Sequence, residues 1–351
     1  MWQLDNRTPY AAERTWVRDR AGAEIWIVAV KCSFDIHADG TTEAAAAQPP
    51  VTQIPEYADP AAPARSSLRH ELDLVRIKLT TDVLLLGEAH ASRGTSVTQL
   101  DVGFRVGPVA KRLLVTGDRV WQGGAPSQPR PFARMPICWE RAYGGIDPGS
   151  RAGPQPQWDE RNPIGTGFAL DATHAEGLPL PNIEYPEQPV QAWNDRPAPA
   201  GFGPLGVHWQ PRRSLAGTYD ERWLRERQPL LPLDFDDRHY QCAPADQQAP
   251  QFLVGGEPVA LVHLAPQSEI RFVLPRVLLG FETSFSDGTR LLHPPPRLYT
   301  VTIEPSAMRG ALVWHSALPC HSKVHKLLKT RIIEKRLLPR GEAAEADAVE
   351  A

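Results

Sequence analysis

The sequence predicts a mainly β protein of antiparallel sandwich-like or barrel-like architecture, with a long Pro/Trp-rich irregular loop region and few short helices. Several segments alternate apolar and polar residues at the period of two that places alternate side chains on one face of a strand. They recur roughly every 10 to 15 residues with turn signals between them, which favours antiparallel sheets over βαβ units. Proline is the third observation: 36 of the 351 residues are Pro, about twice the usual share.

The first β-rich region covers residues 20–125 and begins with the clearest strand of the chain. In 25–36 the alternation places aromatic and aliphatic side chains on one face, while the opposite face turns polar at Lys31 and Ser33. Gly107 followed by Pro108 signals a hairpin turn further on. The other strands predicted in this region are 73–79, 82–90, 99–107 and its hairpin partner 111–121.

The loop-rich region covers residues 126–250. Twenty of the 36 prolines lie in it, and six of the ten tryptophans lie between Trp121 and Trp223. Disordered segments are poor in aromatic residues, so this region is predicted to be ordered, irregular chain with tryptophans buried in it. Proline stiffens such loops because it restricts the unfolded chain.

The second β-rich region covers residues 251–340 and completes one domain of residues 1–340. A short helix is expected near 322–329 and a last strand at 330–338, and the small, acidic residues 341–351 are expected to form a disordered tail. The other predicted strands of this region are 257–266, 269–275, 276–283, 297–305 and 310–319.

Composition limits the function classes. The net charge of −3 gives no electrostatic footprint for nucleic acid. Four scattered cysteines without a CxxC pair do not indicate a disulfide framework. The N-terminus lacks the pattern of a signal peptide, and the apolar run 25–30 is too short to span a bilayer. We therefore expect a soluble, cytoplasmic protein with neither nucleic acid nor membrane as a partner.

Patterns that would indicate catalysis are missing from the sequence. It contains no GxSxG, HExxH or Walker-type GxxxxGK motif, and no GxGxxG after a strand. The Cys and His residues near 239–242 and 320–325 lack a zinc spacing, so neither metal nor cofactor is expected. Paired carboxylates beside tryptophans would suit a glycosidase. The candidates for that alternative are Glu140, Asp159, Glu160 and Asp236, with Trp139 and Trp158 as sugar platforms.

One stretch, WERAYGG at 139–145, reads either as an active-site loop or as a loop framework. Gly144 and Gly145 permit backbone conformations with positive φ, and Arg141 offers five donors for loop carbonyls or a carboxylate. A segment with few ladder hydrogen bonds must satisfy its backbone through such side chains. The structural interpretation accounts for every residue, whereas the catalytic one lacks a nucleophile and a base partner.

Eight motifs in one order give the chain a family resemblance. They are SSLRHELDL (66–74), RVGPVAKRLLVTGDRVW (105–121), WERAYGG (139–145), RNPIGTGF (161–168), LPNIE (180–184), GFGPLGVHWQPRRSLAGTYDERW (201–223), LPLDFDDRHYQCAPADQQ (231–248) and EPSAMRGALVWHSAL (304–318). Together they cover almost the whole chain. The sequence resembles the bacterial domain-of-unknown-function family numbered 2169.

The resemblance implies a role in protein delivery. Members of that family lie among type VI secretion genes, beside the spike protein VgrG, PAAR or PAAR-like tip proteins and toxin effectors, and are regarded as adaptors or chaperones that load an effector onto the spike. It implies no catalytic residue and therefore no enzyme. The motif residues that it marks as framework or partner-contact candidates are Trp139, Glu140, Arg141, Tyr143, Gly144, Gly145, Asn162, Pro163, Gly165, Gly167, Asn182, Asp236 and Asp246.

Three aromatic residues are the first candidates for contact with a protein partner. Trp158, Tyr185 and Trp193 stand among prolines and polar residues in the loop-rich region, and Trp and Tyr dominate interface hot spots. Packing beneath the loops is the alternative for each. Two further functions stay open: a carbohydrate-active enzyme or cell-wall-binding module that uses the Trp and carboxylate loops, and a structural piece of the spike tip.

Overall fold

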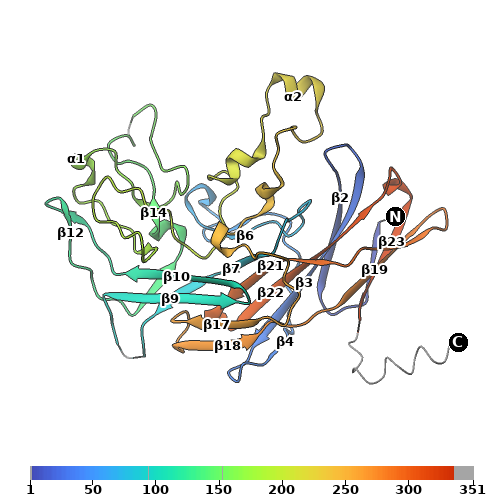
Figure 1. The fold of residues 1–351 in the computed structure, drawn as a ribbon, viewed down its shortest axis with the longest axis horizontal. Coiled ribbons are helices and arrows are strands. Elements are labelled where there is room, and N and C mark those ends of the chain that lie inside the picture. The colour runs from blue at the N-terminus through green and yellow to red at the C-terminus, as the bar shows by residue number, and fades with distance from the viewer. Residues whose placement is uncertain (1, 94, 152, 336–351) are drawn as a thin grey trace.

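The computed structural model describes residues 2–93, 95–151 and 153–335, and these residues form a mainly β protein with few short helices. The sheets lie side by side along the lower part of the molecule in Figure 1, and the irregular segments of the loop-rich region lie above them. No sheet of the described residues closes on itself as a barrel. The predicted tail, 341–351, lies outside the described residues.

The largest sheet has six strands and combines strands from both β-rich regions of the sequence. Its order is β2 (Ala11–Arg18), β3 (Glu24–Ile36), β22 (Arg309–Pro319), β21 (Arg297–Glu304) and β7 (Asp82–Leu85), with β4 (Thr42–Ala44) added to β3. All neighbours are antiparallel except β21 and β7, which run parallel. The strongest predicted strand, 25–36, is confirmed as β3 at the centre of this sheet.

Two smaller sheets complete the sandwich. The first has the order β16 (Ile183–Glu184), β10 (Val109–Thr116), β9 (Gln99–Val106), β17 (Pro258–Val262) and β18 (Glu269–Val273). The second has the order β1 (Gln3–Asn6), β23 (Leu327–Glu334), β19 (Leu279–Phe285) and β20 (Arg290–Leu292), in which β1 and β23 run parallel. The predicted hairpin is confirmed by the antiparallel register of β9 and β10.

One apolar core joins the three sheets. Strand β3 of the six-stranded sheet contacts both smaller sheets. Trp26 near the start of β3 donates its indole N–H to Thr330 of β23 at 3.0 Å. Near the end of β3, the ring of Phe34 meets that of Phe272 of β18 at a centroid distance of 6.3 Å. The apolar face predicted for this strand therefore packs against both smaller sheets.

The remaining elements are short. Four two-strand pairs lie among the loops: β5 (Glu56–Tyr57) with β6 (Leu68–His70), β8 (Gly87–His90) with β13 (Arg134–Ile137), β11 (Trp121–Gln122) with β12 (Ala125–Pro126), and parallel β14 (Tyr143–Gly144) with β15 (Thr166–Gly167). The α-helices are α1 (Ala172–Ala175) and α2 (Glu221–Glu226). The 3-10 turns are Pro63–Arg65, Trp139–Arg141, Arg212–Ala216, Asp237–Tyr240, Ala245–Gln247, Pro305–Ala307 and Val324–Lys326.

Three details differ from the sequence-based predictions. Residues 73–79 form no strand, because their hydrogen bonds form no ladder. The Asp73 backbone N–H donates to the Thr52 carbonyl at 2.9 Å, and the Asp73 carboxylate accepts from the Thr52 N–H at 2.7 Å. The Leu79 N–H donates to the Gln241 side chain at 2.8 Å. Strands β1 and β2 precede the first predicted strand. The helix expected at 322–329 is only a 3-10 turn followed directly by β23.

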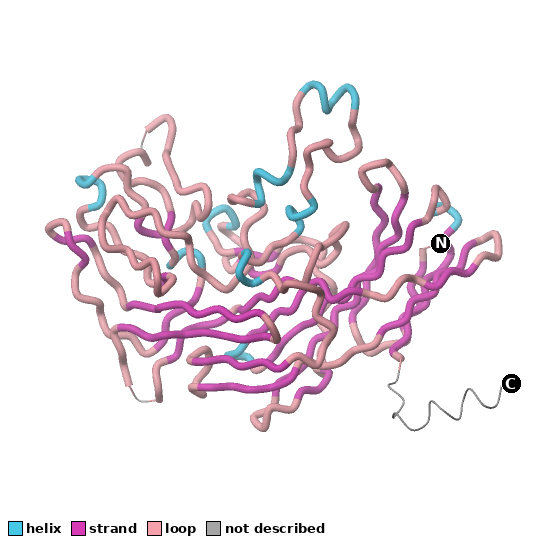
Figure 2. Tube along the Cα trace, in the orientation of Figure 1, coloured by secondary structure: helices cyan, strands magenta, loops and turns pink. Residues whose placement is uncertain are grey.

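The loop-rich region contains little regular structure, as Figure 2 shows by its long pink segments. One excursion, residues 217–234, carries α2 and projects away from the body of the molecule (Figure 1). We refer to these residues as the arm. The rest of the region packs partly against the main core, through residues such as Phe202, and partly around small apolar clusters, of which one contains Trp121, Tyr143 and Phe168.

Candidate functional site

The loop framework gathers most of the residues singled out in the sequence. It consists of residues 139–145, 161–168 and Asn182. Parallel pairing of β14 with β15 brings Tyr143 opposite Thr166 and Gly144 opposite Gly167. Asn182 joins them from the next segment, because its backbone N–H donates to the Arg141 carbonyl at 2.8 Å.

Asn162 is the centre of this framework. Its side chain is fully buried, and its amide donates to the carbonyls of Trp139 at 2.8 Å and Tyr143 at 3.0 Å. Its backbone carbonyl accepts from the N–H groups of Gly145 at 2.8 Å and Gly165 at 3.2 Å. One residue therefore satisfies four backbone groups that have no sheet partner, which a buried loop requires.

The glycines of the framework permit the close approach of its two segments. Gly144 and Gly145 have φ values of 143° and 95°, which L side chains rarely adopt. A Cβ at Gly145 would also overlap the carbonyl oxygen of Gly165, and one at Gly144 would overlap that of Asn162. Pro163 is half-buried in the connecting turn.

The charged residues of the framework are engaged in holding neighbouring loops. The Glu140 carboxylate accepts from the backbone N–H of Ser67 at 2.7 Å and from its hydroxyl. Arg141 donates to the Asn182 side chain at 2.8 Å and lies 3.4 Å from Asp118. Through these contacts, Glu140 and Arg141 connect the framework to neighbouring loops.

Two aromatic residues of the framework are buried. Trp139 donates its indole N–H to the Pro204 carbonyl at 2.9 Å and packs edge-on against Trp209. Its predicted use as a sugar platform is therefore wrong, because only 2% of the residue is exposed. Burial raises the pKa of Tyr143 to about 12, so its hydroxyl stays protonated at neutral pH.

Asp236 and Asp246 lie apart from the framework. Asp236 caps the 3-10 turn 237–240 by accepting from the Arg238 backbone N–H at 2.9 Å, and it pairs with that arginine's side chain. Asp246 accepts from Lys111 at 3.0 Å and from the Tyr185 hydroxyl at 2.9 Å. Both aspartates serve local structure.

The three surface aromatic candidates have different environments. Trp158 is 43% exposed. Trp193 is half-buried and packs against the apolar cluster that contains Trp121 and Tyr143. Tyr185 packs against the main core and lies beneath the Lys111 ammonium, 5.0 Å from its ring centre. Of the three, Trp158 presents the most surface to a partner.

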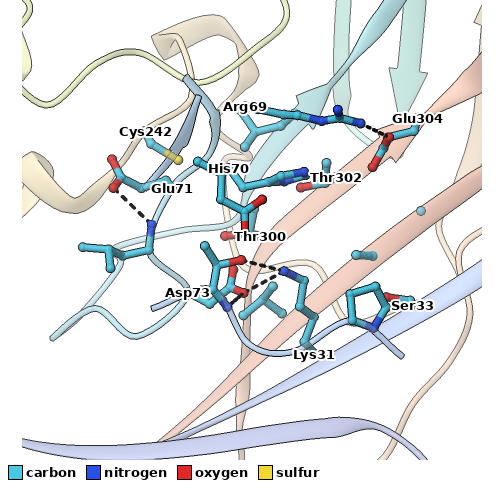
Figure 3. Close-up of a pocket in the computed structure, with 18 of the residues that line it drawn as sticks. Lys31, Ser33, Arg69, His70, Glu71, Asp73, Cys242, Thr300, Thr302 and Glu304 are labelled. Carbon is cyan, nitrogen blue, oxygen red and sulfur yellow. Dashed lines mark hydrogen bonds and ion pairs between the residues drawn. The ribbon is translucent and has the colours of Figure 1, made fainter. Parts of the chain in front are cut away.

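A polar cavity of about 300 Å³ lies on the outer face of the six-stranded sheet. Its floor is formed by β3, β21 and β22, and the segments around 49–52 and 69–73 cover it. Figure 3 shows Lys31 reaching toward Asp73, and Arg69 pairing with Glu304 beside His70. The sequence analysis missed this cavity, although Lys31 and Ser33 on an otherwise apolar strand were a signal for it.

Most charges around the cavity are paired within the protein. Lys31 lies 3.0 Å from Asp73 and donates to the Thr52 hydroxyl at 2.8 Å. Arg69 lies 3.0 Å from Glu304. Burial, and then the charge of Lys31, lower the pKa of His70, so its imidazole is neutral at neutral pH. The cavity thus presents donors and acceptors without a large net charge.

The cysteine at the cavity wall is protonated at neutral pH. Burial raises the pKa of the Cys242 thiol at the cavity wall to about 12, whereas a reactive cysteine needs its thiolate form. Within the described residues, no group of three or more His, Cys, Asp or Glu side chains gathers as metal ligands would. None of the helices in that part of the chain has the length and apolar character needed to span a bilayer.

The fold and the two sites define a mainly β, loop-rich protein that holds its loops by a buried polar framework. The chain belongs to the family described as an uncharacterized protein conserved in bacteria, DUF2169, whose model matches residues 21–315. No curated protein and no solved structure matches the chain.

Proposed function

We propose that this protein is a non-enzymatic adaptor or chaperone that helps to load a toxin effector onto the VgrG/PAAR spike of a bacterial type VI secretion system. Its partners would be the effector and a PAAR or PAAR-like tip protein or VgrG, and it would act in the cytoplasm before the system fires. Family membership supports a bacterial protein, and the delivery role is what the family resemblance of the sequence implies.

The observation that carries the proposal is the arm. Tyr219, Leu224 and Leu233 are all more than half exposed on it, and Leu233 is 73% exposed. Several exposed apolar side chains on one projecting segment favour an interaction site. An adaptor needs such a surface, because its partner must be held and then released.

The arm is held in one shape although it projects. At its base, Asp234 accepts from the backbone N–H of Thr218 at 3.0 Å and from its hydroxyl at 2.7 Å. Near its tip, Trp223 donates its indole N–H to the Leu230 carbonyl at 2.8 Å. A preformed segment loses less conformational entropy when it binds than a disordered one does.

Co-expression tests the proposal. The tagged protein is produced with the products of the neighbouring spike-tip and effector genes, purified by affinity and sized by light scattering. We expect a stable complex with the effector or the tip protein in the lysate. Absence of a complex in every pairing would count against the adaptor function.

An arm variant sharpens this experiment. Leu233→Ser should reduce recovery of the complex while the melting temperature stays the same, because the side chain makes little contact with its own chain. Ile54→Ser is the matched control, since Ile54 is 75% exposed but lies outside the arm. Equal recovery from both variants would exclude the arm as the contact surface.

A further inference from the structure

An apolar groove opens between two sheets, on the opposite face of β22 from the polar cavity. It lies where β19 and β23 of the four-stranded sheet approach β22, and its volume is about 570 Å³. Phe281, Leu292, Trp314 and Ile333 line it, together with the prolines of 294–296. Leu292 is 78% exposed at the rim.

Trp314 is a buried residue of this groove with a polar group that is unpaired in the described part of the chain. The residue is 5% exposed and lines the groove, and its indole N–H has no hydrogen-bond partner among the described residues. A buried donor without an acceptor costs about 1–3 kcal/mol, so such a group points to an acceptor that comes from outside the chain.

The polar groups next to Trp314 are satisfied. His293 uses both ring nitrogens, one with the Ser316 hydroxyl and one with that of Thr283, each at 2.7 Å. Thr283 continues to Thr330 at 2.6 Å, and Thr330 accepts from Trp26. The chain has therefore paired the donors of this seam, and the Trp314 N–H stands out against them.

The walls of the groove indicate the conformation of the occupant. The proline run 294–296 has no N–H groups, so it cannot extend the sheet by pairing with an added strand. Grooves lined by aromatic residues accept extended, proline-rich peptides, whose backbone carbonyls remain free to accept hydrogen bonds. This combination fits Phe281 and Trp314 at the base of the groove.

Charge at the rim adds to the specificity. Lys335 and Arg331 line the groove together with Glu282. Arg331 is paired with Asp5 at 3.1 Å, whereas Lys335 forms no ion pair among the described residues. An acidic residue beside the apolar part of a ligand would meet this lysine.

We propose that the groove binds an extended, proline-containing peptide segment of a protein partner, in which an apolar side chain packs on Phe281 and Trp314 and a carbonyl accepts the Trp314 N–H. The identity of that partner rests on the proposed function, whereas binding of the peptide follows from the groove alone.

The NMR signal of the Trp314 indole N–H reports directly whether that group becomes hydrogen-bonded. The full chain is labelled with ¹⁵N-tryptophan, and the Trp314 signal is assigned from its loss in Trp314→Phe. The probe is the acetylated amide Leu-Pro-Pro-Leu-Glu. We expect the Trp314 signal to shift downfield and saturate, while the signal of Trp26, which is already bonded to Thr330, stays in place. A matched peptide with serine for both leucines should leave both signals unchanged.

Two variants measure the contribution of each contact. Trp314→Phe keeps the apolar ring and removes the donor, so peptide affinity should fall by about 2- to 10-fold. Leu292→Ser changes an exposed rim residue that the core does not need, so the variant should fold normally and bind the peptide less tightly. An unchanged affinity in Leu292→Ser would overturn the proposal.

Other occupants give distinct results. No shift with millimolar peptide would overturn the proposal, even if the co-expression complex forms. A shift caused by removal of residues 336–351 would identify the chain's own end as the occupant, and a shift on dilution would identify a second copy; either would overturn a partner peptide. Peptide binding without any co-expression complex would retain the groove and reject the adaptor function.

Discussion

The six-stranded sheet and the loop framework maintain their shapes in different ways. Strands β3 and β22 pair over eleven successive residues from Arg309 to Pro319, so no single side chain determines their register. In the framework, Asn162 alone satisfies four backbone groups of neighbouring segments. Order in the sheet is distributed along a repeating ladder, whereas order in the framework depends on individual residues.

This difference teaches where substitutions act. In the sheet, a large effect requires loss of buried apolar volume, because the ladder tolerates changes of side chain. In the framework, addition of one methyl group at a glycine is enough. The comparison can be tested by placing the two kinds of change side by side.

The largest effect is expected in the sheet. Phe34 is fully buried on β3, and Phe34→Ala should lower the free energy of unfolding by about 3–5 kcal/mol through lost burial and the cavity left behind. Urea unfolding followed by circular dichroism measures this. Val273→Ala, at a half-exposed position of β18, is the control and should cost less than about 1 kcal/mol. Similar losses in the two variants would contradict the packing described for β3.

The framework should respond to a much smaller change. Gly145→Ala should cost about 3–4 kcal/mol, because the new Cβ combines an unfavourable φ with overlap of the Gly165 carbonyl. Gly124→Ala is the matched control: Gly124 also has a positive φ, of 79°, but nothing lies within 4 Å of its Cβ. It should cost about 1 kcal/mol.

Hydrogen exchange can locate the damage. In Gly145→Ala, amides of the framework should exchange faster while those of β3 and β22 retain their protection. Equal unfolding free energies for the two glycine variants would show that positive φ alone, rather than the close approach, requires glycine at position 145.

The sheet could be predicted from the sequence in large part, because alternation at period two is a local property. It identified β3 and the β9–β10 hairpin correctly. The same property was misleading at 73–79, where the Asp73 carboxylate accepts from the Thr52 backbone N–H, the Leu79 N–H donates to the Gln241 side chain, and the segment forms no strand. Strands β1 and β2 were missed, since most of their residues are half-buried and neither strand has a fully buried apolar face.

The sites were less predictable, because they depend on residues that only the fold brings together. The glycines and Arg141 of the framework signalled a tied loop within one stretch. The polar cavity instead joins Lys31 with Asp73 and Glu304, and no spacing along the chain connects these three. Partner contact by Trp158, Tyr185 or Trp193 stays a prediction, as does the extent of the single domain.

The last prediction asks whether the sandwich relies on apolar packing alone. His293 lies in the polar seam between two sheets, and burial lowers its pKa from 6.5 to about 4. As the pH falls below 6.5, His293 therefore becomes protonated in the unfolded chain while it stays neutral in the folded chain. The contribution of His293 to the free energy of unfolding is therefore fully present above pH 6.5 and is lost as the pH falls toward 4.

Between pH 7.5 and 5 this histidine should reduce the free energy of unfolding by about 2 kcal/mol, measured by urea unfolding at each pH. His293→Gln should be less stable at pH 7.5 but lose less stability on acidification. His37→Asn is the control, because His37 is exposed and lies outside this seam. If His293→Gln leaves the slope unchanged, other groups such as His315, whose pKa burial also lowers to about 4, account for the acid sensitivity. Contact between the two sheets near His293 would then depend on apolar packing. The contrast with the loop framework, which buried polar contacts hold together, would then be larger than the hydrogen bonds of this seam suggest.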